Sequence, residues 1–260
     1  MTAGMEKETL KIAVVSGKGG IGKSVISANL GFILSKKEIQ TVLFDADTQF
    51  PNLHLLQGIE PPVRLSQYYA GQVDIDRVIF KVRDNLNLLA DMPAAGLAEN
   101  YSKSMIINAY ADLLFHNDPD IVIFDAPSGA GDEVLQVCNI ADIIAVVIND
   151  EPTSLLDAYG LIKILREDGM DEKVRIIVNN VIDFEDAEDL SKKLNRATKK
   201  FLKNNYDSLG FIPYNRNVRQ FIIKQELITK NDPEEDVSKA IEKIGNNLIN
   251  NYILSEISNR

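Results

Sequence analysis

Residues 17–24 read Gly-Lys-Gly-Gly-Ile-Gly-Lys-Ser, and this segment constrains the fold more than any other in the chain. A glycine, four residues and then Gly-Lys-Ser is the spacing of a P-loop, whose backbone N–H groups surround a phosphate. The apolar, β-branched run Leu10–Ser16 before it predicts a buried parallel strand, and Val25–Leu34 after it has helical spacing. Strand, turn and helix N-terminus together predict a nucleotide site; the alternative is a glycine turn that fits by chance. The predicted binding residues are Gly17, Lys18, Gly19, Gly20, Ile21, Gly22, Lys23 and Ser24.

Three side chains of this segment are predicted to do chemistry. Lys23 would contact the β- and γ-phosphates, and the Ser24 hydroxyl would ligate Mg²⁺. Lys18 directly follows the first glycine, where folding of the loop does not require a cation. Its charge would lie where negative charge develops during phosphoryl transfer.

With this extra lysine, residues 18–24 resemble the deviant P-loop of the MinD/ParA group of ATPases. The resemblance implies that the bound nucleotide is ATP. It also implies an ATP-dependent homodimer in which Lys18 reaches the nucleotide of the partner subunit. The alternative for Lys18 is an ordinary solvated lysine.

The composition fits a globular protein, since 45% of the 260 residues are hydrophobic and 25% are charged. The net charge of −10 argues against nucleic acid as a partner, because phosphate binding needs a basic surface. A single cysteine, Cys138, rules out a disulfide framework or a Cys-x-x-Cys metal site within one chain, and we expect it in the core. No run approaches about 18 apolar residues and no signal peptide is visible, so we expect a cytoplasmic protein.

Apolar strand-like runs alternate with amphipathic segments along the chain, which favours a mostly parallel sheet. We therefore predict an α/β fold with a doubly wound, mostly parallel sheet and helices on both faces, in the P-loop NTPase architecture. The predicted strands are Leu10–Ser16, Thr41–Asp45, Leu86–Ala90, Ile121–Asp125, Ile143–Ile148, Val174–Val178 and Leu209–Ile212. The predicted helices include Ser104–Phe115, Val134–Ile140, Ser154–Glu167 and Glu185–Asn204. We expect a flexible N-terminus at residues 1–9, an ATPase domain at 10–235 and a C-terminal helix at 236–260.

Acidic residues follow two predicted strands, at the edge where open α/β sheets bind ligands. Asp125 ends an apolar run, as in a Walker B motif, and is predicted to hold Mg²⁺ through water; capping of the next turn is the alternative. Asp45 and Asp47 are two residues apart, so their carboxylates point the same way and need a cation or a water between them. The MinD resemblance implies that Asp47 orients the attacking water, acting with Lys18 and Lys23, and that Asp45 supports Mg²⁺. The start of a helix shortly after them is the alternative.

Two further strand ends are predicted to bind the nucleoside. The amide of Asn179 could donate to and accept from adenine, and the backbone beside Pro213 could read the adenine edge. The alternative for Asn179 is a turn residue. The loop Ser128–Gly131, after Asp125, is a candidate switch that senses loss of the γ-phosphate.

Later segments are similar to FlhG/FleN, the MinD-like ATPases that control the number and placement of bacterial flagella. The similar segments are Asn52–Gly58, Asp150–Lys163, Leu209–Tyr214 and Val218-Arg219, and the similarity spans roughly residues 10–245. The resemblance implies a slowly hydrolysing switch, with the flagellar GTPase FlhF or a related regulator as partner and the helix Thr153–Arg166 as the partner surface. Met1–Glu8 shows nothing like the segment with which FlhG proteins activate that GTPase.

The C-terminal segment carries apolar residues at three- to five-residue intervals, compatible with a helical stripe: Val237, Ile241, Ile244, Leu248, Tyr252 and Ile257. MinD-like proteins bind membrane through a C-terminal amphipathic helix, so the resemblance implies peripheral contact with the inner membrane. The alternative is a last helix packed on the domain, because Arg260 is the single basic residue after Gly245 and membrane-surface helices usually carry several.

Other functions remain alternatives. A division or DNA-segregation ATPase of the MinD/ParA type fits the same motifs, and the segregation type would need a basic face. The candidates for that face are Arg216, Arg219, Lys224 and Lys230. A metabolic ligase of the dethiobiotin or cobyrinic acid type would share the ATP site, but no motif marks its substrate pocket. The lack of paired cysteines disfavours a metal-cluster carrier of the Mrp type, and Asp47 with Lys18 disfavours a scaffold that never hydrolyses.

Overall fold

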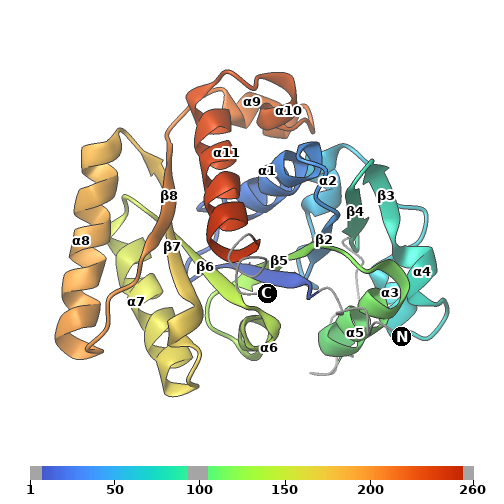
Figure 1. Ribbon diagram of the computed structural model, residues 1–260, viewed down its shortest axis with the longest axis horizontal. Coiled ribbons are helices and arrows are strands. Elements are labelled where there is room, and N and C mark those ends of the chain that lie inside the picture. The colour runs from blue at the N-terminus through green and yellow to red at the C-terminus, as the bar shows by residue number, and fades with distance from the viewer. Residues whose placement is uncertain (1–7, 93–104, 254–260) are drawn as a thin grey trace, which may run out of the picture.

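A central sheet organises the computed structural model, which describes residues 8–92 and 105–253 (Figure 1). Within these residues eight strands run in the order β3-β4-β2-β5-β1-β6-β7-β8, and neighbouring strands are parallel except for the pair β3 and β4. The strands are β1 (Leu10–Ser16), β2 (Thr41–Asp45), β3 (Phe80–Arg83), β4 (Leu86–Leu89), β5 (Ile121–Ser128), β6 (Ile143–Asn149), β7 (Val174–Val181) and β8 (Ser208–Pro213). The predicted α/β class is confirmed, and the carboxyl ends of the parallel strands meet at one edge of the sheet.

Helices cover both faces of this sheet (Figure 1). One face carries α1 (Lys23–Lys36), α2 (Leu53–Gln57), α9 (Val218–Ile223), α10 (Ile228–Asn231) and α11 (Asp236–Leu248). The other carries α3 (Leu65–Tyr69), α4 (Ile75–Val78), α5 (Met105–Asn117), α6 (Asp132–Ile140), α7 (Pro152–Glu167) and α8 (Phe184–Phe201). A 3₁₀ turn at Asp171–Lys173 precedes β7, and a π-helical turn at Ile249–Ile253 follows α11. Because strand side chains alternate between faces, Ile12 and Val14 of β1 pack in the first layer and Ala13 and Val15 in the second.

The predicted strands agree with the structure in position and, for β1 and β2, in both bounds. Strands β5 and β7 continue three residues past their predicted ends, to Ser128 and Val181, and β6 and β8 continue one residue past theirs. The sequence does not predict β3, which is a four-residue, partly exposed strand paired antiparallel with β4 at the edge of the sheet. The predicted helix Ser104–Phe115 corresponds to α5, apart from Ser104, which lies outside the described residues.

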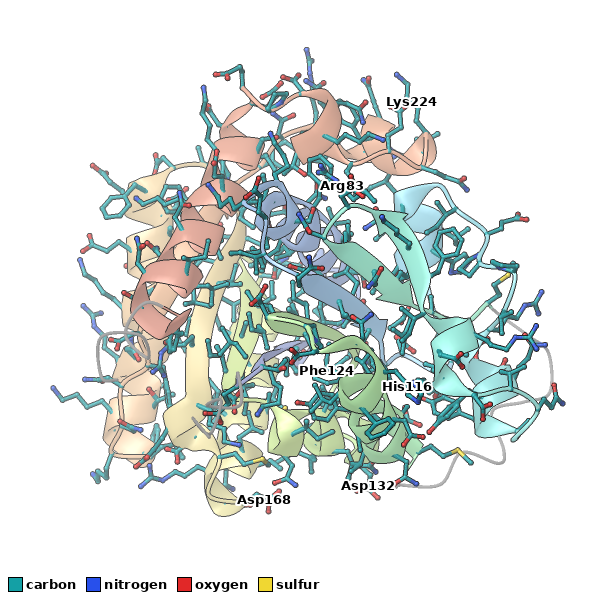
Figure 2. All side chains as sticks on the ribbon, turned by 45° about the vertical axis from the view of Figure 1, so that its right-hand side comes forward. Arg83, His116, Phe124, Asp132, Asp168 and Lys224 are labelled. Atoms are coloured by element: carbon teal, nitrogen blue, oxygen red, sulfur yellow. The ribbon has the colours of Figure 1, made fainter. Side chains whose placement is uncertain are left out.

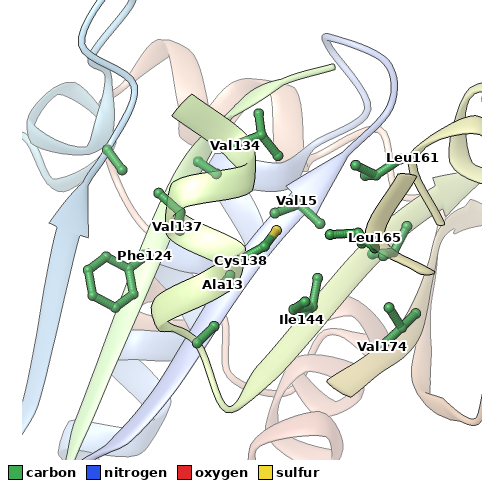
Figure 3. Close-up of a cluster of buried hydrophobic side chains, with 14 of the residues drawn as sticks. Ala13, Val15, Phe124, Val134, Val137, Cys138, Ile144, Leu161, Leu165 and Val174 are labelled. Atoms are coloured by element: carbon green, nitrogen blue, oxygen red, sulfur yellow. The ribbon is translucent and has the colours of Figure 1, made fainter. Parts of the chain in front are cut away.

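Aliphatic and aromatic side chains fill the layer between the sheet and helices α6 and α7 (Figure 3). The Phe124 ring lies 5.2 Å from that of Phe44 on the neighbouring strand, in a tilted arrangement. Cys138 of α6 has no exposed surface and lies beside Val15 of β1 in Figure 3. Burial raises the pKa of its thiol to about 12, so Cys138 is an inert core residue, as predicted.

The C-terminal helix differs from a membrane-binding helix in one respect. The apolar stripe of α11 is packed on α1 and β8, and its residues are at most 2% exposed: Val237, Ile241, Ile244 and Leu248. A stripe already inside the core has no apolar surface to offer a bilayer. The burial of this stripe favours the alternative, a last helix packed on the domain. Residues 254–260 lie outside the described part, and membrane contact through the C-terminal segment stays a prediction.

Thr9 falls within the segment predicted as a flexible N-terminus but is packed on the domain. Thr9 is buried, and its hydroxyl donates to the carbonyl of Pro119 at 2.8 Å, which ties it to the start of β5. Charged side chains such as Asp168 and Lys224 lie on the outside of the molecule (Figure 2). No helix within residues 8–92 and 105–253 is both long and apolar enough to cross a membrane.

Candidate nucleotide site

The loop between β1 and α1 has the backbone shape of an anion-binding turn. Gly20 and Gly22 adopt positive φ angles of 79° and 94°, a region that other residues enter only with strain. Helix α1 begins at Lys23, so its free N–H groups and positive end point toward the loop. Gly17 lies against α7, and only glycine fits there because a Cβ built on it would lie 2.5 Å from the backbone of Asp157. The loop is therefore shaped by its glycines and held against α7.

The predicted phosphate lysine and the predicted Walker B aspartate lie together at the floor of the site. The Lys23 ammonium is 3.4 Å from Oδ1 of Asp125, and both side chains are buried. The Ser27 hydroxyl, one turn further along α1, donates to the same Oδ1 at 2.9 Å. The second oxygen, Oδ2, is buried and has no hydrogen-bond partner. A buried carboxylate oxygen without a donor is costly, and a hydrated Mg²⁺ would satisfy it, so the residues fit that ion.

Asp45 lies next to Asp125 across the sheet, where β2 and β5 pair in register. Its Oδ2 accepts the backbone N–H groups of Asn52 and Leu53, both at 2.9 Å, so the carboxylate closes the loop onto the start of α2. Burial, followed by the charge of Asp125, raises the pKa of Asp45 well above its usual value, and the two N–H bonds act against this rise. This geometry favours the helix-start alternative for Asp45 over contact with Mg²⁺.

Asp47 lines the cavity above the P-loop and is only partly buried. Its Oδ1 accepts the backbone N–H of Phe50 at 2.9 Å, which fixes the carboxylate in a turn. Glu133, at the start of α6, faces it: burial and then the charge of Asp47 raise the pKa of the Glu133 carboxyl. The sequence does not single out Glu133, since only the fold brings α6 near the loop after β2.

The cavity itself has a volume of about 520 Å³ and two chemically different halves. One half is polar and glycine-rich, formed by the P-loop, Asp47 and Ser128 of the candidate switch loop. The other half is apolar and comes from α2 and α9, which the sequence does not predict to take part. The lining residues are Ser16, Gly19, Gly20, Gly22, Lys23, Ser24, Val25, Asp47, Asn52, Leu55, Leu56, Ser128, Ile222, Ile223 and Gln225.

Lys18 does not line this cavity and instead is held by α7. Its ammonium forms an ion pair with Glu151 and donates to the Thr153 hydroxyl at 3.1 Å. The amide of Asn149 donates to the other oxygen of Glu151 at 2.9 Å. Hydrogen bonds from Lys18 and then Asn149 lower the pKa of Glu151, so the acid is ionised opposite the lysine. The lysine that distinguishes this P-loop is therefore directed away from its own phosphate site.

The two predicted nucleoside residues lie in different places. Asn179 is buried, and its amide donates to the Ile21 carbonyl at 2.7 Å, so it braces the P-loop from β7. Pro213 ends β8 and lines a separate hollow with Ile182 and Phe184. Binding of adenine by either residue stays a prediction.

The candidate switch loop touches the P-loop directly. The Gly129 N–H donates to the Ser16 carbonyl at 2.8 Å, and a Cβ built on Gly19 would lie 3.3 Å from the Ser128 hydroxyl oxygen. Gly129 has a positive φ of 99°, a conformation that glycine adopts without a steric penalty. The candidate switch loop therefore lies against the P-loop, and its role as a sensor of the γ-phosphate stays a prediction.

A parallel sheet, a glycine loop at the end of its central strand and a buried Lys–Asp pair at the helix start define a P-loop nucleoside triphosphatase. Comparison with known proteins narrows this class. The family model described as "ParA: NUBPL iron-transfer P-loop NTPase" matches residues 7–249, and the chain belongs to this ParA family. The lone, buried Cys138 gives it no paired cysteines.

Relatives and solved structures agree with this assignment. The chain is 29% identical to the antiactivator FleN of Pseudomonas aeruginosa, over 90% of this chain and 84% of FleN. It is 26% identical to the flagellum site-determining protein YlxH of Helicobacter pylori, over 92% of this chain and 81% of YlxH. The structure of the septum site-determining protein MinD of Pyrococcus horikoshii, complexed with Mg-ADP, superimposes with a TM-score of 0.79 at 21% identity, covering 96% of this chain and 98% of that one. The predicted resemblance to the MinD/ParA group and to FlhG/FleN is confirmed.

Proposed function

We propose that this protein is an ATP-dependent dimerising switch that hydrolyses ATP slowly and regulates the placement or number of a bacterial structure, most simply flagella. The observation that carries the proposal is the position of Lys18, which is bound to α7 and does not line its own cavity. A lysine placed at the mouth of a phosphate site, yet outside it, is suited to reach the nucleotide of a second subunit. The names of FleN and YlxH support the flagellar role, and division or segregation remains the alternative within the family.

The proposed chemistry assigns a task to each group that would contact the nucleotide, its Mg²⁺ or the attacking water. Lys23 holds the β- and γ-phosphates, and the P-loop N–H groups bind the phosphate oxygens. Asp47 orients the attacking water from the partly exposed side of the cavity. Ser24 and the free oxygen of Asp125 would hold Mg²⁺, which when bound offsets the charge that develops on the phosphates.

Partners and location follow from the same proposal. A protein regulator related to the GTPase FlhF is the proposed partner, acting in the cytoplasm. Because the apolar stripe of α11 is buried, peripheral contact with the inner membrane through that helix would require it to leave the domain when ATP binds. Co-sedimentation with anionic vesicles, with and without ATP, measures this directly.

The test of the switch is the molar mass in solution. Asp47→Ala blocks hydrolysis, and light scattering after size exclusion should then show a monomer without nucleotide or with ADP and a dimer with Mg-ATP. Adding Lys18→Ala should return the dimer to a monomer, whereas Lys224→Ala on the exposed surface should not. A mass unaffected by nucleotide would remove the switch, and rapid turnover dependent on an added small acceptor would instead support the ligase alternative.

A further inference from the structure

Two side chains of α1 hold the carboxylate of Asp125, and both contact the same oxygen. The Lys23 ammonium lies 3.4 Å from Oδ1, and the Ser27 hydroxyl donates to Oδ1 at 2.9 Å. Ser27 and Asp125 have no exposed surface. An ammonium that bonds well to a carboxylate lies about 2.7–2.9 Å from it, so the lysine contact is long and the serine bond is the closer one. Ser27 therefore sets the orientation of this carboxylate.

The Ser27 hydroxyl has one proton and two acceptors within reach. Besides Oδ1 of Asp125 it lies 3.2 Å from the Lys23 carbonyl, one turn earlier in α1. The carboxylate is both nearer and charged, and a charged acceptor makes the stronger hydrogen bond. Ser35, further along the same helix, is also buried, and its hydroxyl donates to the Phe32 carbonyl at 2.8 Å. Ser35 thus bonds within its own helix, whereas Ser27 reaches a carboxylate of the nucleotide site on β5.

The bond from Ser27 gains importance when a nucleotide is bound. Among the described residues, Lys23 and Ser27 are the side chains that hydrogen-bond Asp125, and the proposed function directs Lys23 to the β- and γ-phosphates. Asp45, the neighbour of Asp125 across the sheet, bonds instead to two backbone N–H groups at the start of α2. Oδ2 of Asp125 is buried and has no hydrogen-bond partner in the described part of the chain. Because the two oxygens of a carboxylate turn together, the bond to Oδ1 also fixes the place of Oδ2.

We propose that Ser27 is a positioning residue for magnesium. Its hydroxyl holds Asp125 so that Oδ2 stays available to a water of the hydrated ion, since Mg²⁺ in proteins usually keeps several of its waters. Ser27 itself does not line the nucleotide cavity, so it acts through Asp125. The inference rests on the proposed function, in which Ser24 and Asp125 hold Mg²⁺ beside the phosphates. It assigns part of the magnesium dependence of nucleotide binding to a residue outside the P-loop.

The experiment measures the affinity of the full chain for ADP with and without magnesium. ADP is used because it is not hydrolysed and, under the proposed function, leaves the chain monomeric. Fluorescence anisotropy of ADP labelled on its ribose gives one Kd in excess MgCl₂ and one in excess EDTA, and the parent chain should bind more tightly in MgCl₂. Ser27→Ala should raise the Kd in MgCl₂ about tenfold, which corresponds to about 1.4 kcal/mol, and leave the Kd in EDTA unchanged.

Two further variants separate the hydrogen bond from the packing of α1. Ser27→Cys fills the space that alanine leaves, but a thiol donates weakly, so this variant should lose affinity in MgCl₂ as Ser27→Ala does. Ser35→Ala removes a buried hydroxyl of the same helix that donates to the backbone, and it should change neither Kd.

The two Kd values also separate this proposal from the one on which it rests. An equal rise of both Kd values in the Ser27 variants would show a structural role, and no rise in MgCl₂ would show no role; either result would overturn the proposal. A parent chain that binds ADP equally well in MgCl₂ and in EDTA would instead remove the magnesium site of the proposed function, and the role of Ser27 with it.

Discussion

The bracing of the P-loop by Asn179 predicts a difference between two glycine substitutions in the same loop. Gly20→Ala and Gly22→Ala both force alanine into a positive-φ conformation, which costs about 1–2 kcal/mol in each case. A Cβ at Gly20 meets nothing within 4 Å, whereas a Cβ at Gly22 would lie 2.4 Å from the Asn179 amide nitrogen. Asn179 must then move and lose its 2.7 Å hydrogen bond to Ile21, worth about 1 kcal/mol. Gly22→Ala should therefore destabilise by about 2–3 kcal/mol and Gly20→Ala by about 1–2.

Urea unfolding without nucleotide, at pH 7 and 25 °C, measures these two free energies. The same pair is then made in an Asn179→Ala background, where the alanine at position 22 no longer meets an amide. In that background the two glycine substitutions should cost the same. Equal costs in the parent chain, or an excess for Gly22→Ala that survives the loss of Asn179, would refute the view that Asn179 braces the loop.

Three further substitutions test other parts of the structure. Glu151→Gln removes the charge that holds Lys18, so in the Asp47→Ala chain the ATP concentration for half-maximal dimerisation, followed by light scattering, should fall severalfold. The pKa of Asp45 is raised in the folded state, so the contribution of this group to stability is present below its unfolded pKa and is lost as the pH rises. Asp45→Asn removes that loss. In urea unfolding between pH 5 and pH 8, its free energy of unfolding should therefore rise relative to that of the parent chain, by at most about 1.4 kcal/mol per pH unit. Ile241→Ala leaves a cavity under α11 and should cost about 2–4 kcal/mol in the same assay, whereas a loss near zero would mean that α11 is not part of the core.

The sequence predicts those parts of the fold that have a strong local sequence pattern. The strand before the P-loop and the strand ending at Asp45 are continuous β-branched or apolar runs, because parallel strands are buried on both faces. Strand β3 lacks this signal: it alternates Phe80, Lys81, Val82 and Arg83 at the sheet edge, and the Arg83 guanidinium lies 4.9 Å from the Phe32 ring centre. Helices of four to six residues, such as α4 and α9, are too short for a period of 3.6 to emerge.

The candidate site likewise has residues that the sequence predicts and residues that it does not. The P-loop and Asp125 are recognisable because their chemistry lies within a few consecutive residues. The residues that hold this loop in place are distant in the sequence, since Glu151 is 133 residues from Lys18 and Asn179 is 158 residues from Ile21. No local sequence pattern predicts contacts between residues so far apart in the chain. The sequence leaves the role of α11 open for a related reason: an amphipathic stripe specifies that one face is apolar, but not which surface covers it.

Helix α7 contacts the P-loop at two places. Glu151, directly before the helix, holds Lys18, and the backbone of Asp157 packs where a side chain on Gly17 would be. If dimerisation on ATP draws Lys18 away from Glu151, the start of α7 loses one of these two contacts. Linkage then requires reciprocity: by whatever factor ATP-driven dimerisation changes the affinity of α7 for any ligand, that ligand must change the dimerisation equilibrium by the same factor.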